Sequence, residues 1–210
     1  MKIIFCIPGR NFSNNFLVSW TKLLKYCNEN GIQAELSNGY TSIVHLARYT
    51  CLGINPQSDC KKCLNPFGQE IEYDYIMWID SDIIFKPSDF FKLLEHDKDM
   101  VSGLYLRQPA GGTMDSIPIE YACLSKSDKS LWTNEVNGEM IEVFGNGMGW
   151  MLVKKGVFEK TPFPWFGPII EGLDFNGEDV AFQMRAKDAG FPSYVDTNII
   201  VGHEKGVILK

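Results

Sequence analysis

Residues 73 to 85, "YDYIMWIDSDIIF", join an apolar run to two closely spaced aspartates. Residues 75 to 79 are almost entirely apolar, which is typical of a strand that is buried on both faces of a sheet. The run then breaks into an Asp-Ser-Asp turn at residues 80 to 82 before apolar residues resume. Because residues i and i+2 of an extended chain point to the same side, Asp80 and Asp82 can address one ligand together.

Around this strand, the first half of the chain alternates strand-like and helix-like segments. Such alternation predicts an α/β fold with a mixed, mainly parallel central sheet flanked by helices. We expect strands at 2–8, 32–37, 75–79 and 99–106, helices at about 14–28, 41–52 and 87–95, and a loop insertion at 55–70. In the second of these helices, the spacing places Ile43, Leu46 and Ala47 toward the core, with Arg48 on or near that face.

The second half has shorter alternating runs, which predict a small antiparallel hairpin region. Asn137-Gly138 joins two of these runs and is a strong hairpin signal. Further on we expect a strand that turns into a short helix at 149–160, a helix at 177–190, and strands near Tyr194 and Ile199. The continuity of the pattern over 210 residues predicts one domain.

Composition and charge exclude several classes of function. A net charge of −6 gives no basic surface for nucleic acid, and no apolar run approaches the ~18 residues that span a membrane. The short apolar start is cut off by Pro8, Gly9 and Arg10, so it reads as a first strand rather than a signal peptide. The six cysteines are then expected to be reduced, which predicts a cytoplasmic protein.

The aspartate pair comes directly after a strand, where open α/β sheets bind their ligands. Two adjacent carboxylates repel each other unless a cation or a shared proton relieves them. Mg²⁺ or Mn²⁺ would do so, since both prefer oxygen ligands. The alternative is a polar turn in which Asp80 caps the next segment of the chain.

Further acidic and imidazole groups occur in the second half. Glu178 and Asp179 open a predicted helix, where carboxylates also occur simply because they suit the helix dipole. His203 comes after the last strand-like run and can complete a metal site already held by carboxylates, or be structural.

Two other segments are candidates for ligand contact. The loop "GNGMGW", which contains Gly147, lacks the strand–turn–helix order of a dinucleotide fingerprint, so its glycines are expected to let a ligand approach the backbone. Trp165 and Phe166 can stack on a sugar or pack in the core.

The order of these motifs resembles that of the GT-A glycosyltransferases, and within them the small non-processive enzymes of the family-2 type. The resemblance covers roughly residues 2 to 204. It implies a nucleotide-binding half at 1–106, an acceptor-binding half at 107–210, and transfer of a sugar from a UDP- or GDP-sugar to a carbohydrate or glycoconjugate acceptor, with inversion. The implied cofactor is Mn²⁺ or Mg²⁺.

The resemblance also implies a role for each candidate residue. Asp179 matches the catalytic base, and Glu178 would help to bind the acceptor. Asp80, Asp82 and His203 would hold the metal. The donor would contact Pro8, Gly9, Arg10, Arg48, Asp80, Ser81 and Asp82, and the acceptor would contact Trp165, Phe166 and Gly147.

Other interpretations stay open. A phosphohydrolase of the haloacid dehalogenase type also carries Asp-x-Asp after a strand, and a non-catalytic nucleotide- or sugar-binding protein can share the fold. Cys60 and Cys63, with Cys51 and His45, can be read as a small zinc site or as incidental reduced thiols.

Overall fold

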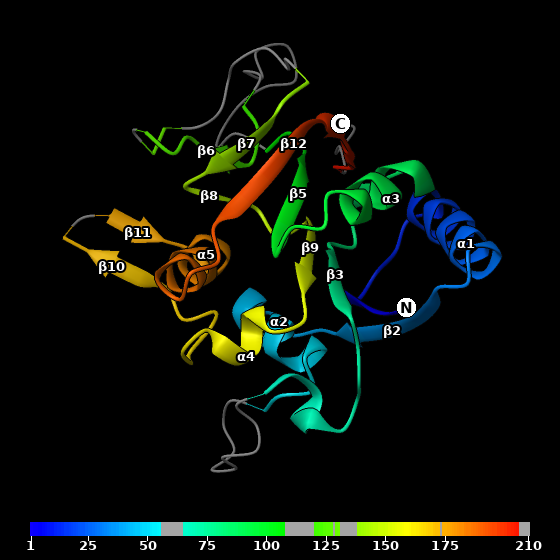
Figure 1. Ribbon diagram of the computed structural model, residues 1–210, viewed down its shortest axis with the longest axis horizontal. Coiled ribbons are helices and arrows are strands. Elements are labelled where there is room, and N and C mark those ends of the chain that lie inside the picture. The colour runs from blue at the N-terminus through cyan, green and yellow to red at the C-terminus, as the bar shows by residue number, and fades with distance from the viewer. Residues whose placement is uncertain (56–64, 108–119, 128, 131–137, 173, 206–210) are drawn as a thin grey trace, which may run out of the picture.

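The structure is a computed structural model of the 210-residue chain, and it describes residues 1–55, 65–107, 120–127, 129–130, 138–172 and 174–205. Strands and helices alternate along the first half of the chain, whereas short strands dominate the second half (Figure 1). The first half contains β1 (Lys2–Pro8), α1 (Asn14–Glu29), β2 (Gln33–Gly39), α2 (Val44–Cys51), the 3-10 helix η2 (Pro66–Gln69), β3 (Tyr75–Ile79), β4 (Ile83–Ile84), α3 (Pro87–Glu95) and β5 (Met100–Leu104). The second half contains β6 (Cys123–Leu124), β7 (Met140–Val143), β8 (Gly145–Asn146), β9 (Trp150–Lys154), α4 (Val157–Lys160), β10 (Ile169–Glu171), β11 (Asp174–Asn176), α5 (Glu178–Asp188), β12 (Ser193–Ile200) and β13 (Gly202–His203).

A seven-stranded sheet in the order β2-β1-β3-β9-β5-β12-β7 forms the centre of the molecule. Strands β1, β2 and β3 pair in parallel, and so do β5 and β12, while β9 pairs antiparallel with both β3 and β5. Strand β7 is antiparallel to β12, so every strand of this sheet except β7 and β9 runs in one direction. The mainly parallel sheet predicted from the sequence is therefore confirmed.

Helices cover both faces of this sheet, because its inner strands are apolar on both sides. In β3, Met77 and Ile79 face the core under α1 and α3, whereas Ile76 and Trp78 face the core under α2, α4 and α5. All five residues of β3 are buried, as the apolar run 75–79 predicts. Figure 1 shows α1 and α3 on one side of the sheet and α2, α4 and α5 on the other.

Small two-stranded sheets lie outside the central sheet. Strand β13 pairs antiparallel with β4, which sets His203 opposite Ile83. Strand β6 pairs with β8, and β10 pairs with β11. The β13–β4 pair is the one that matters for the site, because it brings the end of the described chain beside the Asp-Ser-Asp turn.

Some predicted segments differ from the structure. Helix α2 begins at Val44 rather than near Thr41, because the Thr41 hydroxyl bonds to the backbone N–H and C=O of Ile43 and forms a turn there. Ile43 is therefore 46% exposed, not inward as predicted. The two strands expected near Tyr194 and Ile199 are one strand, β12.

In the predicted hairpin at Asn137-Gly138, residues 131–137 lie outside the described residues, whereas Gly138 has the positive φ of 80° that suits a turn. The second predicted strand of that hairpin is present as β7, and it pairs with β12.

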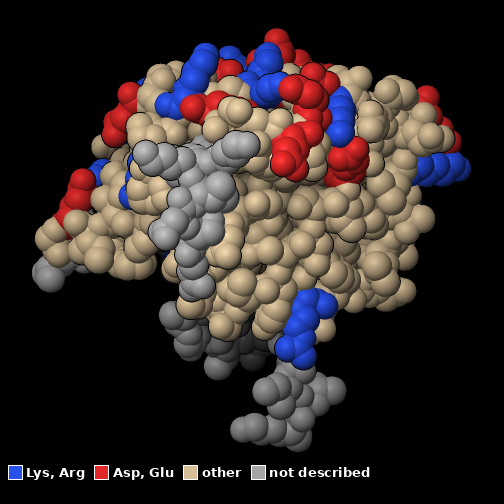
Figure 2. All heavy atoms as spheres, turned by 90° about the horizontal axis from the view of Figure 1, so that it is seen from below, with Lys and Arg blue, Asp and Glu red and all other residues tan. Residues whose placement is uncertain are grey.

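Charged side chains of both signs gather along one edge of the face seen from below in Figure 2, next to a broad area without charges. Because neither sign dominates this face, an anionic ligand would have to be held by a local device rather than by the overall field. Within the described part of the chain, no helix is long and apolar enough to cross a membrane. A cytoplasmic location stays a prediction.

Candidate active site

A cavity of about 440 Å³ opens at the carboxyl ends of β1 and β3. Residues far apart in the sequence meet here, because the parallel β1–β3 pair ends both strands at the same edge. Six of the predicted donor-binding residues line the cavity, namely Pro8, Gly9, Arg10, Asp80, Ser81 and Asp82, together with Asn11, Tyr40, Thr41, Ser42, Val44 and Ala47. Arg10 lies over the Tyr40 ring with its guanidinium carbon 5.7 Å from the ring centre.

The floor of the cavity is formed by close backbone packing. A Cβ atom on Gly9 would lie 2.4 Å from the Cβ of Ser81, so a side chain at this position would push β1 away from the Asp-Ser-Asp turn. The N–H of Asp80 donates to the carbonyl of Gly149 at 2.9 Å, which ties this turn to the start of β9. The backbone of the Asp-Ser-Asp turn is therefore packed against the end of β1 and tied to the start of β9.

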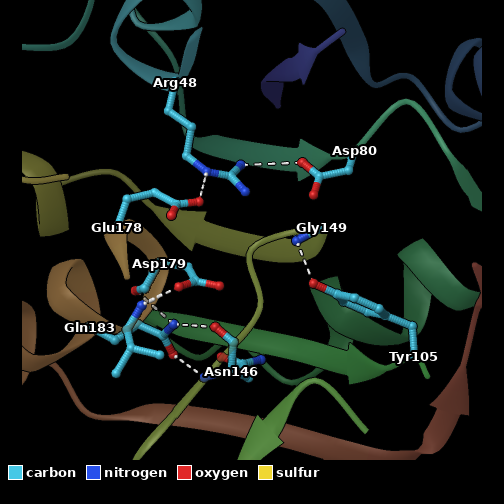
Figure 3. Close-up of polar contacts among 9 residues, drawn as sticks. Arg48, Asp80, Tyr105, Asn146, Gly149, Glu178, Asp179 and Gln183 are labelled. Carbon is cyan, nitrogen blue, oxygen red and sulfur yellow. Dashed lines mark hydrogen bonds and ion pairs between the residues drawn. The ribbon is translucent and has the colours of Figure 1, made fainter. Parts of the chain in front are cut away.

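Arg48 links the two acidic motifs (Figure 3). Its Nη1 lies 3.3 Å from Oδ1 of Asp80, and its Nε lies 3.3 Å from Oε1 of Glu178. The guanidinium carbon also lies 5.5 Å from the ring centre of Trp78, and only 2% of the residue is exposed. Burial by itself lowers the pKa of the guanidinium, but the Asp80 and Glu178 carboxylates raise it above its ordinary value.

This geometry changes the expected role of Arg48. A direct contact with donor phosphates would require an accessible guanidinium, whereas Arg48 is buried and engaged with carboxylates on both sides. We therefore correct the prediction: Arg48 holds Asp80 and Glu178 in place. The sequence placed it correctly on the inner face of α2.

Asp82 is surrounded by two nitrogen groups from the end of the described chain. Its Oδ2 lies 3.3 Å from Nε2 of His203 and 2.6 Å from Nζ of Lys205. Partial burial raises the pKa of Asp82, but hydrogen bonds from His203 and Lys205 outweigh burial and lower the pKa to about 2. Asp82 is thus ionised throughout the physiological range of pH.

Asp82 and His203 fit a divalent cation, whereas Asp80 does not converge with them. Two ligands of one octahedral ion lie about 3 Å apart, which matches the separation of Asp82 Oδ2 and His203 Nε2. The other ring nitrogen of His203, Nδ1, donates to the carbonyl of Leu106 at 2.7 Å, as metal-binding histidines commonly do. Asp80 is turned to Arg48 instead, and no group of three or more His, Cys, Asp or Glu side chains among the described residues is arranged to hold a metal.

Asp179 lies in the opposite electrostatic setting. Burial raises the pKa of its carboxyl, and the neighbouring Glu178 carboxylate raises it further, to about 6. The N–H of Val180 donates to Oδ1 of Asp179 at 2.8 Å, which orients the group at the first turn of α5. A carboxyl with a pKa near the working pH can accept a proton, which is what a general base needs.

Tyr105 is a site residue that we did not predict from the sequence. Its hydroxyl accepts a hydrogen bond from the N–H of Gly149 at 3.1 Å, and its ring centre lies 5.3 Å from that of His203. Burial raises the pKa of the phenol, and the nearby Asp80 and Asp179 carboxylates raise it further. Its position just after β5 was a usable signal, because β5 ends at the same edge of the sheet as β3.

The glycines of the loop "GNGMGW" leave space for the Tyr105 hydroxyl. A Cβ on Gly147 would lie 1.9 Å from the Tyr105 hydroxyl oxygen, and one on Gly149 would lie 2.9 Å from it. The space beside Gly147 is therefore filled by the protein's own side chain, and the prediction of acceptor contact at Gly147 is wrong in this structure.

The side-chain amide of Gln183 anchors the backbone of the same loop to α5 (Figure 3). Gln183 accepts from the N–H of Asn146 at 3.1 Å and donates to the carbonyls of Asn146 and Asp179, at 2.5 and 3.0 Å. The side chains of Gln183 and Asn146 are buried. Helix α5, which carries Asp179, is thus fixed to the glycine-rich loop.

The prediction that Trp165 and Phe166 contact the acceptor is also wrong. Trp165 and Phe166 are 1% and 0% exposed, and both pack in the core beneath α4 and α5. The indole N–H of Trp165 donates to the carbonyl of Thr161 at 2.9 Å, which completes its burial. The alternative of core packing therefore holds.

The possible zinc site cannot be placed, because Cys60 and Cys63 lie outside the described residues. Cys51 is buried, and its pKa is raised to about 12 by burial, so its thiol stays protonated.

No protein-family model and no curated protein sequence matches the chain. Solved structures are similar in fold. The structure of A197 from STIV has a TM-score of 0.57 and 19% identity, covering 100% of this chain and 97% of that one. The catalytic domain of Drosophila beta1,4-galactosyltransferase 7 in complex with xylobiose has a TM-score of 0.51 and 16% identity, covering 98% of this chain and 71% of that one.

A mutant of the same Drosophila enzyme, in complex with manganese, UDP-Gal and xylobiose, has a TM-score of 0.50 and 15% identity over the same shares of both chains. Similarity at this level of identity is informative about the fold alone. The protein has a GT-A-like fold.

Proposed function

We propose that the protein is a metal-dependent glycosyltransferase that moves a sugar from a nucleotide-sugar donor to an acceptor hydroxyl with inversion. The observation that carries the proposal is a cavity lined by Asp80, Ser81 and Asp82 together with a base-like carboxyl at Asp179. Arg48 connects the two, because it pairs with Asp80 and with Glu178, the neighbour of Asp179. The family-2 type assignment rests on the order of the sequence motifs.

The donor is assigned to residues 1–106. The nucleotide would occupy the cavity between the end of β1 and the start of α2, where Arg10 and Tyr40 form a flat, cationic wall. A UDP- or GDP-sugar fits the proposal, since the neighbouring Drosophila enzyme was solved with UDP-Gal and manganese.

Asp82 and His203 would hold Mn²⁺ or Mg²⁺, with Asp80 close by. Such an ion would act as a Lewis acid for the leaving diphosphate. Asp82 can serve because its pKa of about 2 keeps it ionised. An acidic protein can in this way bind an anionic donor.

Asp179 would accept the proton of the acceptor hydroxyl as its oxygen attacks the anomeric carbon. The new bond forms from the acceptor oxygen to that carbon, the bond to the diphosphate oxygen breaks, and its electron pair leaves with the diphosphate. A single displacement of this kind inverts the anomeric centre. Glu178, held by Arg48 at the first turn of α5, would help to position the acceptor, a carbohydrate or glycoconjugate assigned to residues 107–210.

A thermal melting screen tests the proposal. UDP, GDP, CMP and dTDP are each added with and without Mn²⁺, since a ligand that binds only the folded protein raises the melting temperature by mass action. We expect one diphosphate to raise the melting temperature only in the presence of Mn²⁺. If no nucleotide does so, the transferase proposal loses its donor site, and phosphatase assays of the haloacid dehalogenase type become the next test.

A further inference from the structure

The strongest feature that the proposed function does not use is Lys205. Its Nζ lies 2.6 Å from Oδ2 of Asp82, the same oxygen that faces Nε2 of His203. The inference drawn from it rests on the proposed function, because it concerns the metal ligands named there.

His203 and Lys205 approach the same oxygen of Asp82. Nε2 of His203 lies 3.3 Å from Oδ2, and Nζ of Lys205 lies 2.6 Å from it. A metal bound to Oδ2 and Nε2 would have to take a place that the Lys205 ammonium now occupies, because a positive charge already lies against this oxygen.

Lys205 is also free to move without unfolding anything. The backbone before it is fixed, since the N–H of Glu204 donates to the carbonyl of Asp82 at 2.8 Å and β13 pairs with β4. The Lys205 side chain is 37% exposed and lies on a flexible four-carbon stem. Rotation of this stem can take the ammonium off Asp82 while the segment stays in place.

Lys205 lines a second cavity, of about 430 Å³, into which its side chain can turn. This cavity is lined by Asn11, Phe12, Ser13, Ser81, Asp82, Glu204 and Lys205, and it shares Asn11, Ser81 and Asp82 with the nucleotide cavity. Lys205 therefore lies at the junction of the two cavities, where the diphosphate of a donor bound through Asp82 would be within reach of its ammonium.

We propose that Lys205 is an internal competitor of the metal at Asp82, which occupies the carboxylate in the metal-free protein and moves to the donor diphosphate when the metal binds. An ammonium and a divalent cation repel each other strongly at one carboxylate oxygen, so binding of the metal requires Lys205 to leave. A diphosphate gives the displaced ammonium a new partner. Metal and donor should therefore strengthen each other's binding, with Lys205 as part of the coupling.

The test is titration of Mn²⁺ alone into the 210-residue chain, measured by calorimetry. Lys205→Met removes the charge and keeps the stem, and Lys205→Arg keeps the charge. Lys154→Met is a matched control, because Lys154 has the same side-chain exposure of 37% and a pair of the same length, 2.6 Å, with Asp97. Asp82→Asn identifies the Mn²⁺ that binds at this site.

We expect Lys205→Met to bind Mn²⁺ about fivefold more tightly than the wild type, the scale of one partly exposed ion pair. Lys205→Arg and Lys154→Met should bind as the wild type does. Equal or weaker binding by Lys205→Met overturns the inference, and the metal site of the proposed function stands if Asp82→Asn alone loses Mn²⁺. Absence of Mn²⁺ binding in both wild type and Lys205→Met also overturns it, and the nucleotide melting screen then decides separately on the proposed function.

Discussion

The turn after β3 and the first turn of α5 each present aspartates to the site, and the protein sets their carboxyls to opposite behaviour. Asp82 lies beside two cationic or polar nitrogen groups and has a pKa of about 2. Asp179 is half-buried next to a second carboxylate and has a pKa of about 6. One residue type thus supplies a permanent anion at one place and a group that can take up a proton at the other.

The two pKa values indicate which role each carboxyl suits. Where neighbouring titratable groups have environments that push their pKa values apart, the group with the raised value suits proton transfer and the group with the lowered value suits a cation. Arg48 makes the two regions dependent on each other, because one buried guanidinium serves a carboxylate from each. Substitutions at these residues test whether the two carboxyls differ in this way.

The largest effect is expected for Asp179→Asn. The amide keeps the shape of the side chain but cannot accept the proton, so the rate of transfer should fall about 10²- to 10⁴-fold. Nucleotide affinity in Mn²⁺ should stay within about twofold of the wild type. Both are measured with the nucleotide found in the melting screen and its sugar donors, and Asp188→Asn, at the exposed end of the same helix, is the control. Full activity of Asp179→Asn would move the base elsewhere.

Arg48→Met should have the next largest effect, and it acts on stability. Removing one partner of a buried ion pair leaves Asp80 and Glu178 uncompensated, which costs about 3 kcal/mol in the free energy of unfolding. Denaturant unfolding measures this loss. Arg107→Met is the control, since Arg107 pairs with Glu120 at a more exposed position and should cost less than about 1 kcal/mol. Equal losses in the two variants would contradict the linking role of Arg48.

Asp82→Asn should weaken nucleotide binding in Mn²⁺ by at least about tenfold, because the amide is a poorer metal ligand. Binding in the presence of EDTA should change little, which separates loss of the metal from damage to the cavity. The exposed aspartate variant Asp97→Asn is the control. If Asp82→Asn binds nucleotide and Mn²⁺ as the wild type does, Asp82 belongs to a polar turn and not to a metal site.

The sequence predicted the fold and the positions of the site residues better than the contacts among them. The apolar run at 75–79 and the alternation of helix and strand were sufficient for the sheet, because burial on both faces leaves a pattern that depends on few long-range contacts. The same pattern located the Asp-Ser-Asp turn at the ligand-binding edge and placed Arg48 on the inner face of α2. Periodicity was therefore sufficient to predict where these side chains lie.

The contacts among those side chains were not predictable in the same way. Nothing in the sequence indicates that Arg48 is shared between Asp80 and Glu178, that Lys205 lies on Asp82, or that Tyr105 fills the space beside Gly147. Each of these depends on the packing of elements that are distant in the sequence. Trp165 and Phe166 show the same limit, since an aromatic, proline-rich segment reads alike whether it faces a sugar or the core.

The smallest effect concerns the pH dependence of stability, and it tests the Asp179 side of the comparison without any substrate. The pKa of Asp179 is about 6 in the folded protein and about 4 in an unfolded chain, so the folded state binds the proton more tightly. Its contribution to stability is therefore fully present below pH 4 and is lost as pH rises through about 6. Two pKa units correspond to about 3 kcal/mol, which partial solvent exposure reduces to about 1–2 kcal/mol.

Asp179→Asn should match the wild type in free energy of unfolding at pH 4 and exceed it by that amount at pH 8. Denaturant unfolding at both pH values measures the difference. Asp188→Asn, at an exposed site, is the control. If the two variants show the same pH dependence, the pKa of the Asp179 carboxyl is not raised, and Asp179 does not differ from Asp82 in the way described.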